Sequence, residues 1–264
     1  MRIAYIGGGN MGGALLRAQQ RFLPDSSALL IEPDSAKRER LAHETGCEAL
    51  AQPSAALRHA DWLVLAVKPQ VAVEVLRGLQ EWGHPEQLVL SVMAGVSLDT
   101  LSRELPHRRL VRVMPNTPAL VEQGMTVFHV APEVSAAERD QVKNFLGALG
   151  QCLEVSGEET IDAATAVSGS GPAYVFYFAE HLMAAAQGLG FTPGDSRLLV
   201  EQTLQGALQL WKQSGLEAGE LRRQVTSPGG TTEAALKHFE SSEVGPQLQE
   251  GVRQAYRRAR ELAG

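Results

Sequence analysis

Hydrophobic and polar positions form two alternating patterns in the first half of the chain. Short, continuous apolar runs are bounded by Gly, Pro or Asp, and the longer segments between them repeat apolar residues at helical spacing. Parallel strands that are covered on both faces have such continuous apolar runs. The pattern predicts strands at residues 3–6, 28–31, 62–67, 88–92 and 110–114.

The segments between these runs have the spacing of amphipathic helices, at residues 11–22, 35–45, 70–79 and 98–105. Strands that alternate with helices indicate βαβ units and an α/β fold with a doubly wound (Rossmann-type), mostly parallel sheet. A strand at 124–130, a helix at 135–149 and a strand at 152–155 are expected to complete this sheet.

The pattern changes after Gly157, and no strand is predicted from Ile161 onward. Proline residues at 172 and 193 are expected at helix starts, where a missing N–H has no cost. We therefore predict a first α/β domain at residues 1–157 and a second, all-helical domain at 158–264. The helices expected in the second domain lie at 172–188, 193–213, 217–224, 232–240 and 246–262.

Composition narrows the function classes. The 264 residues are 44% hydrophobic and 20% charged, as in a globular protein, and a net charge of −6 argues against a nucleic-acid binder. No apolar run is long enough to span a bilayer or to form a signal peptide, so a cytoplasmic location is expected. Cys47 and Cys152 are too few and too far apart for a disulfide framework or a zinc site.

A glycine-rich turn follows the first predicted strand. Gly7, Gly9 and Gly12 fit the spacing G-x-G-x-x-G, with Asn10 and Met11 inside the motif, and a helix begins here. In this context the first glycine permits a tight turn, the second a close approach to a pyrophosphate, and the third close packing of helix on strand. The motif predicts a dinucleotide site.

The choice of dinucleotide stays open at the second strand. Glu32 ends this strand, where an acidic residue usually binds the ribose 2′-hydroxyl of NAD. Lys37, Arg38 and Arg40 follow closely and are either partners of a 2′-phosphate or members of a solvated helix face.

Later strand ends add further candidates, because dinucleotide contacts gather at the carboxyl ends of parallel strands. Lys68 is either a cofactor contact or an exposed lysine. Asn116, held between two prolines, either binds the ligand or caps its own turn. The cofactor candidates at these strand ends are Ala66, Val67, Lys68, Pro69, Ala94, Gly95 and Asn116.

Two runs of small residues in the second domain are candidates for a substrate site. Residues 168–171 (Ser-Gly-Ser-Gly) precede a long helix, and we expect a turn with free N–H groups there. Residues 226–232 (Thr-Ser-Pro-Gly-Gly-Thr-Thr) open another helix, whose first N–H groups suit a carboxylate. A threonine at this helix start is a ligand-binding residue, an N-cap, or both. The candidates are Ser168, Ser227, Gly229, Gly230, Thr231 and Thr232.

Lysine and histidine are scarce in the first half of the second domain. Residues 161–211 contain no lysine and a single histidine, His181, inside an apolar helix. No Ser-His-Asp arrangement and no metal-ligand cluster is recognisable in the sequence. We therefore expect a reaction that depends on a cofactor and on positioning.

Five segments together are similar to one known family. They are residues 6–11 (Ile-Gly-Gly-Gly-Asn-Met), 66–69 (Ala-Val-Lys-Pro), 112–119 (Arg-Val-Met-Pro-Asn-Thr-Pro-Ala), 167–174 (Val-Ser-Gly-Ser-Gly-Pro-Ala-Tyr) and 225–232 (Val-Thr-Ser-Pro-Gly-Gly-Thr-Thr). In this order they closely resemble pyrroline-5-carboxylate reductase. The resemblance implies NAD(P)H-dependent reduction of the C=N bond of Δ1-pyrroline-5-carboxylate to L-proline, the last step of proline biosynthesis.

The resemblance also implies residue roles and an assembly. The substrate carboxylate would lie on the N–H groups of Gly229, Gly230 and Thr231, and Thr232 would be the catalytic residue that hydrogen-bonds the ring nitrogen. Members of the family often prefer NADPH, which makes NADPH the expected cofactor and NADH its alternative, with Glu32 unfavourable for a 2′-phosphate. The helical domain would form a homodimer, extended in many members to a decamer, with sites built from two subunits.

Two other functions are consistent with parts of the pattern. A β-hydroxyacid dehydrogenase shares the two-domain plan, but its catalytic lysine would fall in the lysine-free stretch. A non-catalytic dinucleotide-binding module would not require residues 227–232.

Overall fold

The first strand shows why the sheet is covered on both faces. The structure is a computed structural model that describes residues 1–263. In β1 (Arg2–Ile6), Ile3 and Tyr5 belong to one buried apolar cluster, and Ala4 and Ile6 belong to a second. Because successive side chains of a strand point to opposite faces, the two clusters lie on opposite faces of the sheet.

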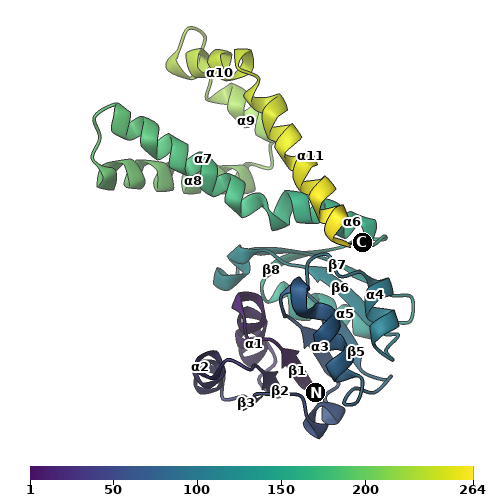
Figure 1. Cartoon of the computed structure of the whole chain (residues 1–264). Coiled ribbons are helices and arrows are strands. Elements are labelled where there is room, and N and C mark those ends of the chain that lie inside the picture. Colours follow the sequence, from purple (N-terminus) through teal and green to yellow (C-terminus); the bar gives the residue numbers. More distant parts are fainter. Residues whose placement is uncertain (264) are drawn as a thin grey trace. The chain divides into compact units, whose positions relative to one another are not determined.

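The described chain forms one eight-stranded sheet in the order β3-β2-β1-β4-β5-β6-β7-β8 (Figure 1). Only β6 and β7 pair antiparallel, and the other neighbours are parallel. The predicted mostly parallel, doubly wound sheet is confirmed. The remaining strands are β2 (Ser27–Ile31), β3 (Glu48–Leu50), β4 (Trp62–Leu65), β5 (Leu88–Ser91), β6 (Leu110–Met114), β7 (Gly124–Val130) and β8 (Gly150–Glu154).

Helices cover both faces through their apolar stripes. Leu15 and Leu16 of α1 and Phe145 of α5 join the cluster of Ile3, whereas Leu76 of α3 joins that of Ala4. The α-helices of this region are α1 (Asn10–Phe22), α2 (Ser35–Thr45), α3 (Ala72–Leu79), α4 (Leu98–Glu104), α5 (Ala136–Gly147) and α6 (Glu159–Ala164). Short 3-10 turns lie at η1 (Ala55–His59), η2 (Pro69–Val71) and η3 (Thr117–Val121).

Two features were not predicted. The edge strand β3 has only three residues, none of them buried, so it lacks a strand's apolar signature. Before residue 171, α6 is followed by the π-helical turn η4 (Thr165–Gly169) and a bend at Ser170. The expected turn at residues 168–171 is therefore wrong, because Ser168 and Gly169 are helical and Gly171 begins the next helix.

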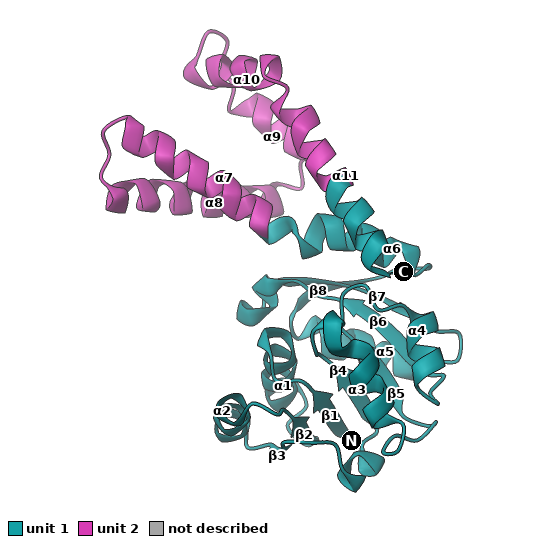
Figure 2. Ribbon diagram, viewed as in Figure 1, with its two compact units in different colours: residues 1–172, 254–264 teal, residues 173–253 magenta. Residues whose placement is uncertain are grey.

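The chain divides into two compact units (Figure 2). The first contains Met1–Pro172 and the chain from Gln254 on, and the second contains Ala173–Arg253. The second unit holds α7 (Gly171–Gly188) from its third residue on, α8 (Pro193–Ser214), α9 (Ala218–Gln224), α10 (Thr231–Ser241) and the first half of α11 (Val244–Ala263). No strand occurs among the described residues beyond 154, as predicted for the region after Ile161. The predicted functional boundary at 157/158 stays a prediction.

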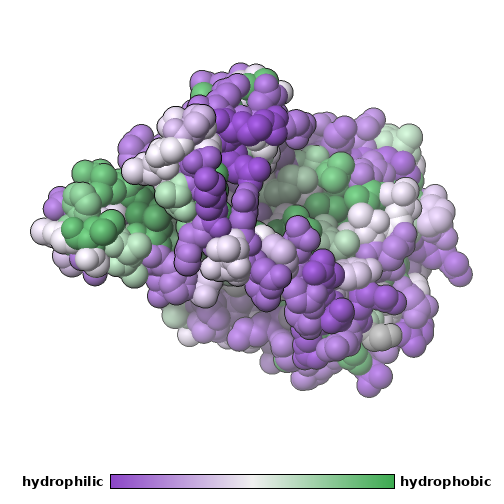
Figure 3. All heavy atoms as spheres, turned by 90° about the horizontal axis from the view of Figure 1, so that it is seen from above, coloured by the Kyte–Doolittle hydropathy of each residue, from purple (hydrophilic) through white to green (hydrophobic). Residues whose placement is uncertain are grey.

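The second unit buries little of its apolar surface. Among residues 173–253 only Ser196 and Val200 are buried. Figure 3 shows hydrophobic side chains gathered at the left of the view, over the ends of α7 and α8. The large apolar side chains exposed in this unit are Val175, Phe176, Tyr177, Phe178, Leu189, Phe191, Leu198, Leu199, Leu208, Leu210, Trp211, Val225, Phe239, Val244 and Leu248.

Candidate active site

The glycine motif forms a tight turn between β1 and α1. Gly7 has a φ of +104°, and a Cβ atom there would lie 2.7 Å from the carbonyl oxygen of Ala66. A Cβ at Gly12 would overlap the carbonyl oxygen of Gly7, so this glycine permits the close packing of helix on strand that was predicted. At Gly9, the N-cap of α1, nothing lies within 4 Å of the added Cβ. The turn is thus closed toward the sheet and open at the helix N-terminus, as a pyrophosphate cradle requires.

Glu32 braces this turn from the end of β2. Its Oε2 atom accepts a 2.7 Å hydrogen bond from the Gly8 N–H, and its Oε1 atom accepts a 3.0 Å bond from the Asp34 N–H. The residue is only 7% exposed. The structure therefore gives Glu32 a definite role within the fold, as the acceptor that orders the glycine turn. Binding of a ribose hydroxyl by Glu32 stays a prediction.

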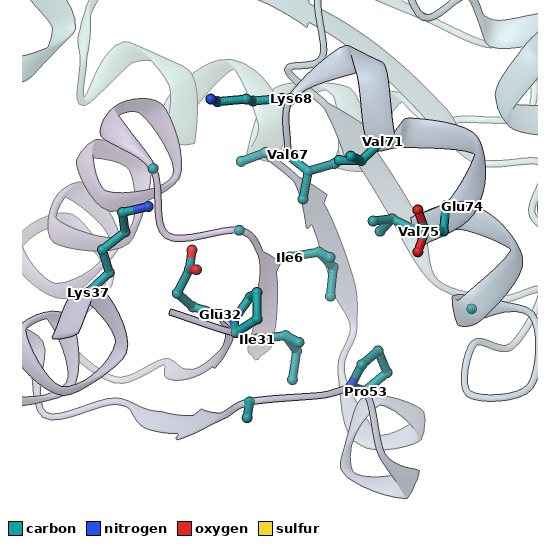
Figure 4. Close-up of a pocket in the computed structure, with 16 residues that line it drawn as sticks. Ile6, Ile31, Glu32, Lys37, Pro53, Val67, Lys68, Val71, Glu74 and Val75 are labelled. Atoms are coloured by element: carbon teal, nitrogen blue, oxygen red, sulfur yellow. The ribbon is translucent and has the colours of Figure 1, made fainter. Parts of the chain in front are cut away.

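A cavity of about 490 Å³ lies at the carboxyl ends of β1, β2 and β4 (Figure 4). It brings together six of the predicted cofactor residues, namely Gly7, Gly9, Glu32, Ala66, Val67 and Lys68. Apolar side chains, among them Ile6, Ile31, Val71 and Val75, form much of its wall. The size and lining suit a nucleoside, and the open glycine turn lies at the same edge of the sheet.

The remaining cofactor candidates do not line this cavity. Asn10, Met11 and Gly12 begin α1, and Pro69 begins η2 beside the lining residue Lys68. Ala94 and Gly95 follow β5, and Gly95 has a φ of +73°. A Cβ at Gly95 would lie 2.7 Å from the Leu262 carbonyl oxygen, so this glycine accommodates the end of α11.

The side chain of Asn116 bonds two other segments and does not cap its own turn, which was one of the two alternatives considered from sequence. Its Nδ2 donates to the Ser168 carbonyl oxygen at 3.0 Å, and its Oδ1 accepts from the Met125 N–H at 2.9 Å. It makes no side-chain cap to its own turn. Its amide thus bridges β7 and the π-helical turn. A direct contact of Asn116 with cofactor or substrate stays a prediction.

The expected free N–H groups at residues 168–171 are in part used by the helix. The Ser170 N–H donates to the Thr165 carbonyl oxygen at 2.8 Å, and the Ser168 hydroxyl donates to the Ala164 carbonyl oxygen at 3.0 Å. The π-helical hydrogen bond fits a sequence without bulky side chains at these positions. Ser168 as a substrate contact stays a prediction.

In the second unit, residues 226–232 form a turn that opens α10. Gly229 has a φ of +71°, and Thr231 is the first residue of α10. Gly230 is the N-cap, with no side-chain cap bond, so the alternative of a threonine N-cap is wrong. The Gly230 N–H donates to the Ser227 carbonyl oxygen at 3.0 Å. No hydrogen bond within residues 1–263 uses the Thr232 hydroxyl or the N–H groups of Thr231 and Thr232. These groups remain available to a carboxylate or a ring nitrogen.

Glu233 is a residue of this turn that the sequence did not single out as functional. Its Oε2 atom accepts from the Gly229 N–H at 2.9 Å and lies 3.3 Å from Lys237 Nζ. The Gly229 N–H, and then Lys237, hold the pKa of Glu233 below its usual value. The position of Glu233 in the sequence could have identified this role, because an acidic side chain three residues after the N-cap commonly accepts a hydrogen bond from the backbone at the start of its helix.

Some kinds of site are absent from the described chain. No group of three or more His, Cys, Asp or Glu side chains within residues 1–263 is arranged to hold a metal ion. No helix among these residues is long and apolar enough to cross a membrane.

A mostly parallel sheet, a glycine turn and a nucleoside-sized cavity at its carboxyl edge define the class of dinucleotide-binding α/β proteins. Residues 2–95 match the family model described as NADP oxidoreductase coenzyme F420-dependent, and residues 158–262 match the pyrroline-5-carboxylate reductase dimerisation model. The chain belongs to the pyrroline-5-carboxylate reductase family.

Relatives support this membership over nearly the whole length. The pyrroline-5-carboxylate reductase of Pseudomonas aeruginosa is 40% identical, over 99% of this chain and 97% of its own. The solved reductase of Coxiella burnetii is 33% identical with a TM-score of 0.90, covering 99% of this chain and 98% of that one. The Plasmodium falciparum enzyme, solved with NADP bound, is 27% identical with a TM-score of 0.88, covering 100% and 98%.

Proposed function

We propose that this protein reduces the C=N bond of Δ1-pyrroline-5-carboxylate to give L-proline, with NADPH as cofactor. The observation that carries the proposal is the similarity to named reductases across both the nucleotide-binding and the helical regions. The β-hydroxyacid dehydrogenase alternative lacks support, because residues 161–211 contain no lysine. A module that only binds dinucleotide would not account for the similarity at residues 158–262.

The residues of the first unit fit a dinucleotide. Gly9 leaves space for a pyrophosphate at the N-terminus of α1, and the cavity beside it has the apolar walls that a nucleoside requires. NADPH is favoured over NADH because a related reductase binds NADP and residues 2–95 match an NADP oxidoreductase model. When bound, the cofactor would supply the hydride that reduces the ring carbon.

The residues of the second unit fit a small carboxylate. The unpaired N–H groups of Thr231 and Thr232 at the start of α10 would bind the substrate carboxylate, with Ser227, Gly229 and Gly230 shaping the turn. The Thr232 hydroxyl would hydrogen-bond the ring nitrogen and orient it. An imine nitrogen is readily protonated, so this reaction does not require a strong general acid, consistent with the absence of lysine from residues 161–211.

The assembly is part of the proposal. The family's dimerisation model covers residues 158–262, and residues 173–253 bury only two of their own side chains. We propose a functional division at 157/158, a homodimer formed by the helical region, active sites that include residues of two subunits, and assembly of dimers into a decamer. We propose that the enzyme acts in the cytoplasm on a small-molecule substrate.

The direct test is consumption of NADPH and NADH with Δ1-pyrroline-5-carboxylate, compared with a panel of hydroxyacids and ketoacids. Turnover with the pyrroline and none with the panel is the expected result. Thr232→Ala is expected to lower kcat by about 10²-fold, because it removes a hydrogen bond to the reacting nitrogen. Folded protein that consumes neither cofactor with the pyrroline would contradict the proposal, and an unchanged rate in Thr232→Ala would contradict the role of that hydroxyl.

A further inference from the structure

Three basic residues follow β2, and only one of them lines the nucleotide cavity. Lys37 belongs to the cavity wall, together with Glu32 and Lys68, whereas Arg38 and Arg40 do not. Lys37 and Lys68 both line the cavity, and Figure 4 shows their amino groups in the upper left of the view, above the Glu32 carboxylate. In a fold of this kind the ribose that carries the 2′-substituent lies beside the end of the second strand.

The two arginines are engaged elsewhere. Arg38 Nη1 donates to the carbonyl oxygens of Glu32 and Pro33, at 2.8 and 3.1 Å, and so fastens the end of β2 to α2. Arg40 Nε lies 3.9 Å from Glu44 Oε1 on the same helix. Neither guanidinium group is placed to receive a phosphate in the cavity.

The carboxylates near Lys37 do not immobilise it. Its Nζ atom is 3.7 Å from Asp34 Oδ2, beyond hydrogen-bond distance, and its side chain is about half exposed at 51%. Glu32 directs both carboxylate oxygens to backbone N–H groups. The other carboxylate of the cavity wall, Glu74, belongs to α3, and Lys68 supplies a second positive charge. Lys37 is therefore a half-exposed cation, in a long ion pair with Asp34, on a cavity wall that carries two lysines and two glutamates.

We infer that Lys37 determines the preference for a 2′-phosphorylated cofactor, by pairing its ammonium group with the 2′-phosphate. The inference rests on the proposed function, because it assumes that the cavity holds the adenosine end of NADPH. Glu32 acts on the same preference indirectly. It orders the glycine turn, and its own bonds to Gly8 and Asp34 hold its carboxylate away from the rim.

Binding of cofactor fragments tests the inference without turnover. Calorimetric titration would compare adenosine 2′,5′-bisphosphate, which carries the extra phosphate, with adenosine 5′-monophosphate. Lys37→Ala is expected to weaken binding of the bisphosphate about tenfold, the scale of one hydrogen bond to a charged group, and to leave the monophosphate unchanged. Lys37→Arg should retain most of the preference. In steady-state assays the KM for NADPH should rise in Lys37→Ala, whereas the KM for NADH should not.

Arg40→Ala is the matched control, because it removes a cation from the same helix outside the cavity wall. It is expected to bind both fragments as the native protein does. Equal losses for the two fragments in Lys37→Ala, or no loss for either, would overturn the inference. If the native protein reduces the pyrroline, and Lys37→Ala has the same ratio of activity with NADPH to activity with NADH, the role of Lys37 is contradicted and the proposed function is not. Absence of native turnover contradicts the proposed function instead.

Discussion

Several side chains that were expected to bind a ligand form hydrogen bonds to the protein backbone. Glu32 and Asn116 both lie at strand ends, and both use their polar atoms for backbone groups of other segments. Their residue types and positions were readable from the sequence. Their partners were not, because Gly8, Ser168 and Met125 come close only after the chain folds.

His107 is a buried residue whose proton affinity follows from packing. It is 1% exposed, its Nε2 atom lies 3.2 Å from Gln87 Oε1, and its Nδ1 atom has no partner among the described residues. Burial, with the nearby positive charges of His84 and Arg109, lowers its pKa to about 4. In the unfolded chain the pKa of a histidine is about 6.5.

The low pKa of His107 predicts a specific loss of stability in acid. Between about pH 6.5 and pH 4 the unfolded chain binds a proton at this residue and the native protein does not. The free energy of unfolding should therefore fall as the pH decreases through this window, by at most about 1.4 kcal/mol per pH unit. The measurement is urea unfolding of the native protein and His107→Gln at pH 7 and pH 5.

The informative quantity is the change in unfolding free energy between the two pH values in each protein. The native protein should lose more stability than His107→Gln, whatever the stability of the variant at pH 7. Equal pH-dependent losses would show that His107 does not titrate in this range.

At the scale of elements, one arginine fastens α6 to the sheet. Arg112 of β6 is 3% exposed, and its guanidinium donates to Glu158 Oε1 at 2.9 Å and to Asp162 Oδ1 at 2.6 Å. The same Glu158 oxygen accepts from the Leu98 N–H at 2.8 Å, at the start of α4. These bonds fix the helix that leads into the π-helical turn and residue Ser168.

Arg112→Met is expected to destabilise the protein by about 3 kcal/mol, because it leaves two largely buried carboxylates without their cation. Urea unfolding at a fixed protein concentration measures the effect. Arg258→Met is the control, since Arg258 pairs with Glu261 on an exposed helix face, and such pairs contribute little. Similar stabilities of the two variants would show that the buried cluster does not fasten α6.

For the molecule as a whole, the helical unit leaves most of its large apolar side chains exposed. With only Ser196 and Val200 buried among residues 173–253, its exposed apolar side chains have no core of their own. Large apolar side chains exposed in this number are typical of a unit that associates with another protein surface. The coarse conclusion, association through the helical region, agrees with the dimerisation model matched by residues 158–262.

Sedimentation velocity should give a mass of at least twice 28.4 kDa. Phe176→Asp places a charge on α7 at a side chain that is 68% exposed in the single chain, and it is expected to lower the mass and the melting temperature. Phe22→Ser, which alters an exposed aromatic residue of the first unit, should leave the mass unchanged. A native mass of 28.4 kDa at all concentrations would contradict the homodimer.

Most helices and strands, the class of the sheet and the location of the glycine turn could be predicted from the sequence. These depend on local signals: apolar runs of strand length, helical periodicity, and glycines at fixed spacing. The prediction failed at β3, which lacks an apolar run, and at residues 168–171, where small residues suggest a turn but a π-helical turn ends and the next helix begins.

The tertiary structure was needed to show which polar atoms have hydrogen-bond partners within the protein and which can bind a ligand. From sequence, Lys37, Arg38 and Arg40 were equivalent neighbours, and Glu32 was a candidate for binding the ribose 2′-hydroxyl. The fold directs Arg38 to two backbone carbonyls, Glu32 to two backbone N–H groups, and Lys37 to the cavity wall. These roles depend on hydrogen bonds between segments that are remote in sequence, and local residue spacing does not predict such bonds.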